Sequence, residues 1–196
     1  IEQLADDGVI VAPLTLQGGL AVLRKTAPGQ VSGRLDAEPA YFMTMRPADP
    51  GDDDGRVDVP GFHGPVSLTT TGTPVTAWQD LDFRLWLDLH LPAGRIADRF
   101  DDGSGRTGVT VYTLDARAEV DYRRGEEGAW PVRQDAARLW DTVEAAWQRW
   151  QRHGRPGRTR IGLTATTGDA AGTAGGDQFA WLDDPDGPLR WPLPGR

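Results

Sequence analysis

The feature that most constrains the fold is a regular spacing of apolar residues in the third quarter of the chain. Val132 is followed by apolar side chains at intervals of three or four positions, and these are Ala136, Leu139, Trp140, Val143, Trp147 and Trp150. This spacing predicts an amphipathic helix over residues 131–153. Pro131 suits the first turn of a helix, and Gly154 stands just past the expected end.

Most of the remaining chain has the pattern of short strands. Apolar or alternating runs bounded by glycine, proline or aspartate occur at residues 9–14, 20–26, 30–35, 56–59, 66–70, 108–114, 118–123, 160–166, 179–182 and 189–193, with a further apolar patch at 41–43. The run at 9–14 has the composition of a fully buried strand, and residues 1–5 are expected to be the last turn of a helix. We therefore predict an α+β fold, with a mixed or antiparallel sheet and one long amphipathic helix.

Residues 81–91 are ambiguous between strand and helix. Leucine or phenylalanine alternates strictly with other side chains, and this period of two fits a strand with one polar face. Five of the six apolar residues are leucine and none is β-branched, which favours a helix. Asp80 is a suitable N-cap, and Pro92 with Gly94 would end a helix. We favour the helix.

Composition limits the classes of function. The chain has 196 residues, enough for one domain or for one domain with a piece of another. No apolar run approaches the length of a membrane span. The net charge of −8 argues against nucleic acid, whose binding depends on neutralising phosphates. The sequence contains no cysteine, which fits a reducing cytoplasm.

Four residues are candidates for contacts with a substrate: His63, Arg84, Trp86 and His90. His63 lies in a turn-like Gly-Phe-His-Gly-Pro segment that could line a cleft. An exposed Trp86 beside Arg84 and His90 would suit contact with a peptide. The alternatives are a solvated or hydrogen-bonded histidine and a tryptophan packed in the core.

No pattern in the sequence predicts a metal site. The three histidines are far apart, and zinc requires clusters of cysteine or histidine at short, fixed separations. Aspartates gather at 52–54, 101–102 and 183–186, but none of these groups has the spacing of an EF-hand calcium loop. They are expected to be solvated loop carboxylates.

The N-terminal residues carry a more specific pattern. Gln-Leu at 3–4 is followed by Asp-Gly at 7–8 and by the run VIVAPL at 9–14. This pattern resembles the end of the catalytic domain of protein-L-isoaspartate O-methyltransferases, where a helix ending in Gln-Leu leads through a Gly-Gly turn into a late sheet strand that closes with proline. Asp7 stands where that family has the first glycine.

Three later segments extend the resemblance. LAVLRKT at 20–26 resembles the final antiparallel strand of the methyltransferase domain. YFMTMR at 41–46 and the Leu-Trp-Leu stretch within 80–92 resemble the long actinobacterial members, which carry a C-terminal extension. Several of those members tailor ribosomally made peptides by methylating an aspartate carboxylate.

The resemblance implies two parts in the chain. Residues 1–45 would be the terminal strands of an incomplete Rossmann-like methyltransferase domain, and residues 46–196 an α+β accessory domain that recognises the substrate. The parent would transfer a methyl group from S-adenosylmethionine to a carboxylate of a protein or peptide. The family's cofactor loop and acceptor region would lie before Ile1, so we assign no catalytic, cofactor-binding or metal-binding residue and expect this chain alone to be inactive.

Two alternatives remain from other classes of function. The chain could be a stand-alone module that binds a peptide or protein, or a module through which its parent dimerises. In either case the N-terminal strands, if uncovered, would favour self-association. The expected partner in every case is a peptide or protein, not nucleic acid or a membrane.

Overall fold

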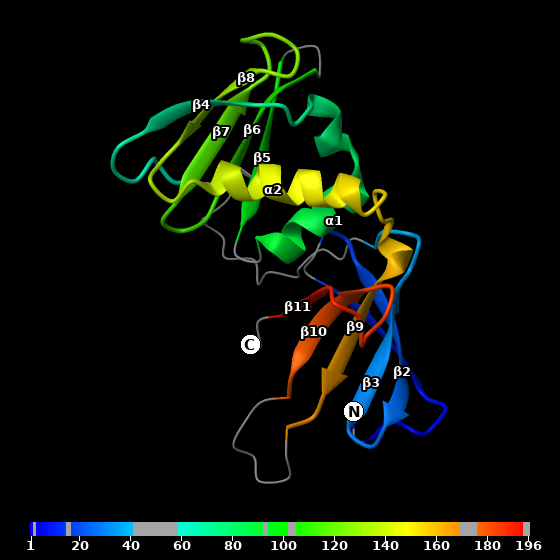
Figure 1. Cartoon of the computed structure of the whole chain (residues 1–196). Coiled ribbons are helices and arrows are strands. Elements are labelled where there is room, and N and C mark those ends of the chain that lie inside the picture. Colours follow the sequence, from blue (N-terminus) through cyan, green and yellow to red (C-terminus); the bar gives the residue numbers. More distant parts are fainter. Residues whose placement is uncertain are drawn as a thin grey trace, which may run out of the picture. The chain divides into compact units, whose positions relative to one another are not determined.

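The computed structural model describes residues 1, 3–14, 17–40, 59–91, 94–101, 105–168 and 176–193. Within them the fold is α+β, with two antiparallel sheets and two α-helices (Figure 1). The chain divides into two compact units. Unit 1 comprises Ile1–Met43, Arg84–Pro92 and His153–Arg196, and unit 2 comprises Thr44–Phe83 and Ala93–Arg152. The division at residue 45 that the resemblance implies concerns the parent protein and stays a prediction.

Unit 1 is built on a six-stranded sheet. Its strands, in spatial order, are β1 (Val9–Pro13), β2 (Leu20–Ala27), β3 (Gln30–Leu35), β9 (Ile161–Thr166), β10 (Gln178–Leu182) and β11 (Arg190–Pro192). All neighbouring strands pair antiparallel. Strands from both ends of the chain share this sheet, because β3 pairs with β9. The buried side chains of one sheet face are apolar and include Leu23, Val31, Leu163 and Trp191. Because this face is buried, more buried and more exposed residues alternate along much of β2 and β3.

The prediction that residues 9–14 form a fully buried strand is wrong. β1 lies at the edge of its sheet and pairs with β2 alone. Because successive side chains of a strand point to opposite faces, Val9 and Val11 share one face, where they are 43% and 58% exposed. The described residues before β1 form turns and not the end of a helix, and the Leu4 N–H donates to the Ile1 carbonyl at 3.0 Å.

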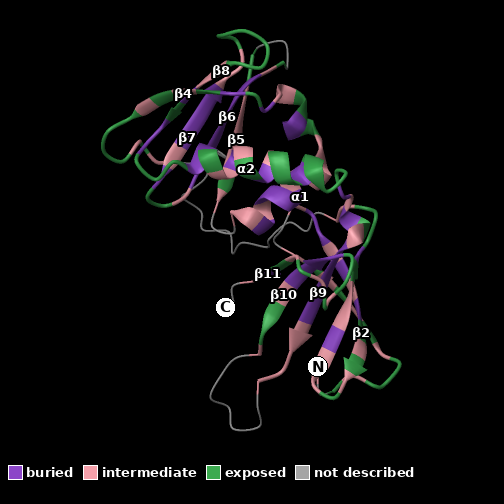
Figure 2. Ribbon diagram, in the orientation of Figure 1, coloured by how far each residue is buried: buried purple, intermediate pink, exposed green. Residues whose placement is uncertain are grey.

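Unit 2 is a second antiparallel sheet with a helix on one face. The strands, in spatial order, are β4 (Ser67–Thr71), β8 (Trp130–Gln134), β7 (Arg117–Asp121), β6 (Arg106–Tyr112) and β5 (Arg95–Phe100). Helix α2 (Leu139–Arg152) contacts β6, β7 and β8. Buried residues lie along the middle strands and on the facing side of α2 (Figure 2). This core contains Val109, Val111, Val120, Val132, Trp140, Val143 and Trp150.

The long helix is confirmed, but its predicted start is eight residues too early. The segment 130–134 is strand β8, in which Val132 pairs with Val120 of β7 and Thr69 of β4. A turn then separates the strand from α2, and Ala136 in that turn is exposed. The Gln134 side-chain oxygen accepts from the Trp140 N–H at 3.0 Å, which satisfies a backbone donor at the start of the helix. The apolar spacing before Leu139 was therefore coincidental.

The helix favoured for the leucine-rich stretch is confirmed. Helix α1 (Leu81–His90) follows a short 3₁₀ turn (Val75–Gln79), and the Asp80 carboxylate accepts from the N–H groups of Asp82 and Phe83 at 3.0 and 3.2 Å. Asp80 is thus the predicted N-cap. Five of the ten helix residues are buried, namely Phe83, Leu85, Trp86, Leu87 and Leu89. The first three helix residues belong to unit 2 and the rest to unit 1.

The other predicted strands mostly agree with the structure. Strands occur at all the remaining predicted positions from 20 onward, except at 56–59, where residues 56–58 lie outside the described residues. The apolar patch at 41–43 also lies outside them. Strand β5 was not predicted. Among the described residues, no helix is both long and apolar enough to cross a membrane.

Candidate functional site

A pocket of about 390 Å³ opens on the sheet of unit 2. It is lined by Leu68, Arg99, Glu119, Asp121, Arg124, Pro131 and Arg133. The side chain of Gln134 reaches helix α2, where its Nε2 donates to Asp141 at 3.0 Å. Because neighbouring residues of a strand point to opposite faces, Arg133 points away from α2. The pocket therefore lies on the sheet face opposite the helix.

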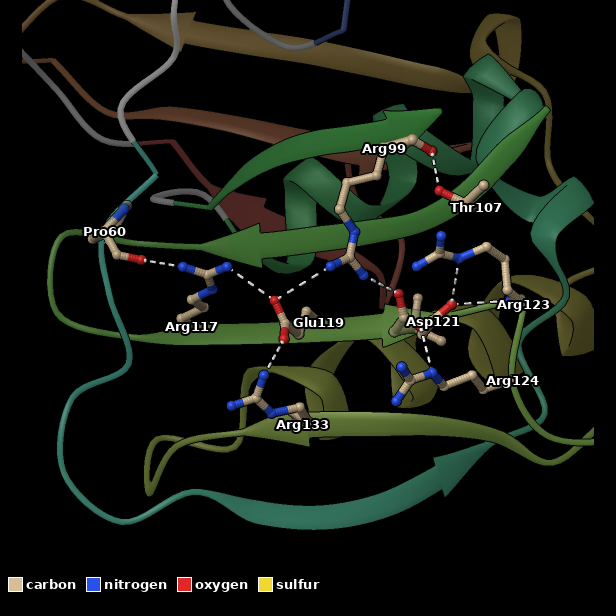
Figure 3. A network of polar contacts seen from close by, with 10 residues as sticks. Pro60, Arg99, Thr107, Arg117, Glu119, Asp121, Arg123, Arg124 and Arg133 are labelled. Carbon is tan, nitrogen blue, oxygen red and sulfur yellow. Dashed lines mark hydrogen bonds and ion pairs between the residues drawn. The ribbon is translucent and has the colours of Figure 1, made fainter. Parts of the chain in front are cut away.

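A buried carboxylate stands at the centre of this face. Glu119 in β7 is 8% exposed. Its Oε2 accepts from Arg117 Nη2 at 2.9 Å, and its Oε1 accepts from Arg133 Nη1 at 3.0 Å (Figure 3). Arg99 approaches from β5, with its Nη1 3.6 Å from Oε2. One carboxylate thus holds arginines from three strands, and strand register causes this, since Glu119 and Arg133 are directly paired.

A second carboxylate lies two residues further along β7. Asp121 accepts from the Arg123 N–H at 3.0 Å and from Arg123 Nε at 3.4 Å, and Arg124 Nε lies 3.5 Å from its other oxygen. Burial raises the pKa of the Asp121 carboxyl, but the Arg123 hydrogen bonds and both arginine charges outweigh it, so the net pKa is lowered. The side chain is therefore charged at neutral pH.

Further contacts hold Arg99, Arg117 and Arg133 in place before any ligand binds. Arg99 Nη2 donates to the Val120 carbonyl at 2.6 Å, and Arg117 Nη1 donates to the Pro60 carbonyl at 2.9 Å. The guanidinium groups of Arg117 and Arg133 lie over the Phe62 ring, 4.8 and 4.9 Å from its centre. Groups held in this way lose little side-chain entropy when they bind a ligand.

The charge of the site is opposite in sign to that of the chain. Five arginines surround two carboxylates, which leaves three positive charges in excess, whereas the whole chain carries −8. The side chains of Arg99, Arg124 and Arg133 are 42%, 79% and 54% exposed. Each guanidinium has five N–H donors, of which the contacts above use one or two. The pocket can therefore offer several charged donors to an anion.

The four residues predicted as substrate contacts belong to different units, His63 to unit 2 and the other three to unit 1. His63 is exposed and follows Phe62, so it lies at the border of the arginine cluster. Arg84, Trp86 and His90 belong to unit 1. Trp86 is fully buried, with its ring 4.9 Å from that of His90 and 5.2 Å from that of Trp191. Its environment corresponds to the core-packing alternative, and a substrate role for these residues stays a prediction.

The arginine cluster was missed from the sequence. Its members come from three strands and a turn and lie up to 34 positions apart, and β5 and β8 were not predicted as strands. One signal was present in β7, where charged Arg117, Glu119 and Asp121 alternate with apolar Ala118 and Val120. Such alternation predicts one charged face and one buried face. Among the described residues, no group of three or more histidine, cysteine, aspartate or glutamate side chains could hold a metal ion.

Removing the charge of Glu119 should affect stability and anion binding in opposite directions. Glu119→Gln keeps the side-chain shape but leaves the arginines without their shared counter-charge. We expect a loss of about 1–3 kcal/mol in the free energy of unfolding at low ionic strength. Sulfate should restore more stability to this variant than to the wild type, because an anion that binds the folded state stabilises it.

Urea unfolding with and without sodium sulfate measures both effects. Glu127→Gln is the matched control, since Glu127 is an exposed residue of the same unit. It corrects for the general stabilisation that sulfate gives to folded proteins. Equal stability of Glu119→Gln and the control, with an equal response to sulfate, would contradict the assigned role of Glu119.

Comparisons with family models, with curated proteins and with solved structures found no match to this chain.

Proposed function

We propose that the arginine-lined pocket binds a carboxylate of a peptide or protein substrate. The chain would then be the substrate-recognising portion of an S-adenosylmethionine-dependent carboxyl O-methyltransferase. The observation that supports binding is the lining of a pocket of about 390 Å³, where three partly exposed arginines outnumber two carboxylates, in a chain of net charge −8.

The chemistry of the arginines favours a carboxylate. A guanidinium group presents two parallel N–H donors that match the two oxygens of a carboxylate. Arg99, Arg124 and Arg133 present such groups at the pocket, and each is more than a third exposed. A bound carboxylate would meet donors from β5, from β8 and from the turn after β7.

The distribution of charge favours a peptide over nucleic acid. Nucleic acid requires a basic stripe that follows many phosphates, and the net charge of the chain would repel a long polyanion. Three of the five clustered arginines, Arg99, Arg124 and Arg133, line one pocket within unit 2. A single acidic group on a peptide meets the local positive charge without placing many negative charges near the acidic surface.

Methyl transfer is proposed on the resemblance of residues 1–45 and 80–92 to the carboxyl methyltransferases. S-adenosylmethionine would be held by the part of the parent that precedes these residues. A carboxylate-binding pocket suits such a parent, because the groups to be methylated are themselves carboxylates. We also propose that the protein acts in the cytoplasm.

A second candidate is a dimerisation module. It is favoured by one observation, the exposure of Val9 and Val11 on edge strand β1. An exposed edge strand offers unpaired backbone groups to a second chain. Sedimentation velocity over a range of protein concentrations tests this candidate, and a sedimentation coefficient that stays at the monomer value throughout would exclude it.

The proposed pocket predicts a charge-dependent affinity for acidic peptides. Arg99→Gln and Arg133→Gln should each weaken binding of a blocked peptide with one aspartate by about 5–30-fold, the equivalent of roughly 1–2 kcal/mol. Arg133→Lys should lose less, since it keeps the charge but not the paired donors. Fluorescence anisotropy of a labelled peptide measures the affinities.

The control is Arg149→Gln, which removes an exposed arginine of α2 on the other side of the same sheet. A peptide with asparagine in place of aspartate should not bind. The pocket would lose its proposed role if Arg149→Gln weakened binding as much as Arg99→Gln, or if the asparagine peptide bound equally well.

The proposal assigns substrate recognition to this chain and cofactor binding to the rest of the parent. It therefore predicts that the chain alone does not bind S-adenosylmethionine. Calorimetric titration should give no binding heat for the cofactor, since the family's cofactor loop is expected outside this sequence. Tight binding of S-adenosylmethionine by the isolated chain would overturn that assignment. It would not affect the peptide pocket, which the arginine variants test separately.

A further inference from the structure

We infer that the pocket recognises two side chains of its ligand, a carboxylate and a large apolar group two residues away in an extended segment. This inference rests on the proposed function and adds the sequence context of the ligand. It comes from the uneven lining of the pocket, in which apolar Leu68 of β4 and Pro131 of β8 adjoin the charged side chains of Arg133, Glu119, Asp121, Arg99 and Arg124.

The apolar part is formed by Leu68 and Pro131. Leu68 lies on edge strand β4 and is 74% exposed. A single exposed leucine is common on protein surfaces. Leu68 differs because it lines the same pocket as the arginines and is paired directly with Arg133 in the β4–β8 register. Pro131 lies beside it on β8 and lines the pocket as well. An apolar side chain bound here would cover Leu68 and part of Pro131.

The charged part lies one to two strands away. Arg99 and Arg133 both reach Glu119 of β7, and Arg124 reaches Asp121 of the same strand. A carboxylate between these guanidinium groups would therefore lie above β7. Arg124 uses its Nε on Asp121 and Arg133 uses one Nη on Glu119, so both can direct further N–H groups to the ligand.

Strand spacing sets the distance between the two parts. Neighbouring strands are about 4.8 Å apart, so β7 is about 7 Å from the midline between β8 and β4. A peptide that crosses the strands in extended form advances about 3.4 Å per residue, and its alternate side chains point to the same side. Residues two apart thus span about 7 Å and could place one side chain over Leu68 and the other among the arginines.

Charge and shape together favour this ligand over a free anion. A small inorganic anion would use the arginines alone and gain nothing from Leu68. A peptide with both side chains removes the leucine from water while its carboxylate pairs with the arginines, and burial of apolar surface adds to affinity. Both orders of the two residues along the peptide satisfy this spacing, because a segment can cross the sheet in either direction.

The test is a mutant cycle between peptide and protein. The probes are the blocked, fluorescently labelled peptides Gly-Ser-Leu-Ser-Asp-Ser-Gly and Gly-Ser-Asp-Ser-Leu-Ser-Gly, each with a partner in which leucine is replaced by alanine. For at least one order, we expect the alanine peptide to bind the wild-type chain about fivefold or more weakly. Leu68→Ser should abolish this difference by weakening the leucine peptide alone.

Leu114→Ser is the matched control, because Leu114 is a 96% exposed leucine of the same unit that does not line the pocket. It should preserve the difference between the leucine and alanine peptides. Circular dichroism checks that both variants fold, which is expected since both leucines are exposed. A third peptide, with leucine next to aspartate, should lose the advantage of leucine.

The outcomes separate this inference from the proposed function. Arginine-dependent binding of every acidic peptide, with no leucine effect in either order, would overturn the inference and leave the proposed function intact. The same leucine effect in Leu68→Ser as in the wild type would also overturn it. Binding of inorganic phosphate but of no acidic peptide would overturn both.

Discussion

The arrangement of the arginines in unit 2 depends on the ion pairs of Glu119. Without a shared carboxylate, the charges of Arg99, Arg117 and Arg133 would repel one another on the same face of the sheet. With it, guanidinium groups from three strands converge on one point and keep donors that face solvent. An isolated salt bridge on a protein surface adds little to the free energy of unfolding. These ion pairs differ because Glu119 is largely buried and its contacts form a network.

The antiparallel sheet allows this network to coexist with a core. One face of β6, β7 and β8 packs against α2 through valines and tryptophans, whereas the opposite face carries the charged side chains. In the five residues of β7, charged and apolar side chains alternate, so the same strand contributes to the charged face and to the core. The helix fixes the strand positions, and the strand positions fix the arginines. A rigid scaffold of this kind is what a preorganised binding pocket requires.

Local signals predicted more of the fold than of the site. The leucine-rich stretch became helix α1 because composition and the Asp80 cap outweighed its alternation. The start of α2 was misplaced because Val132 happens to continue the helical spacing, while its pairing with Val120 and Thr69 involves residues far along the chain. The site depends on the same kind of distant pairing, with Arg133 opposite Glu119. No local pattern in the sequence reveals such a register. The alternation of charged Arg117, Glu119 and Asp121 with apolar residues indicated only the one strand, β7, that carries the carboxylates.

The central claim is that the exposed arginines of the pocket receive a carboxylate, and their own NMR signals test it most directly. Titration of the ¹⁵N-labelled chain with a blocked aspartate peptide should shift the Nε–Hε resonances of Arg99, Arg124 and Arg133 along one saturating curve. The resonances of Arg149 and Arg152, which are exposed on α2, should stay in place. Unchanged pocket resonances, or shifts of equal size on α2, would contradict the account.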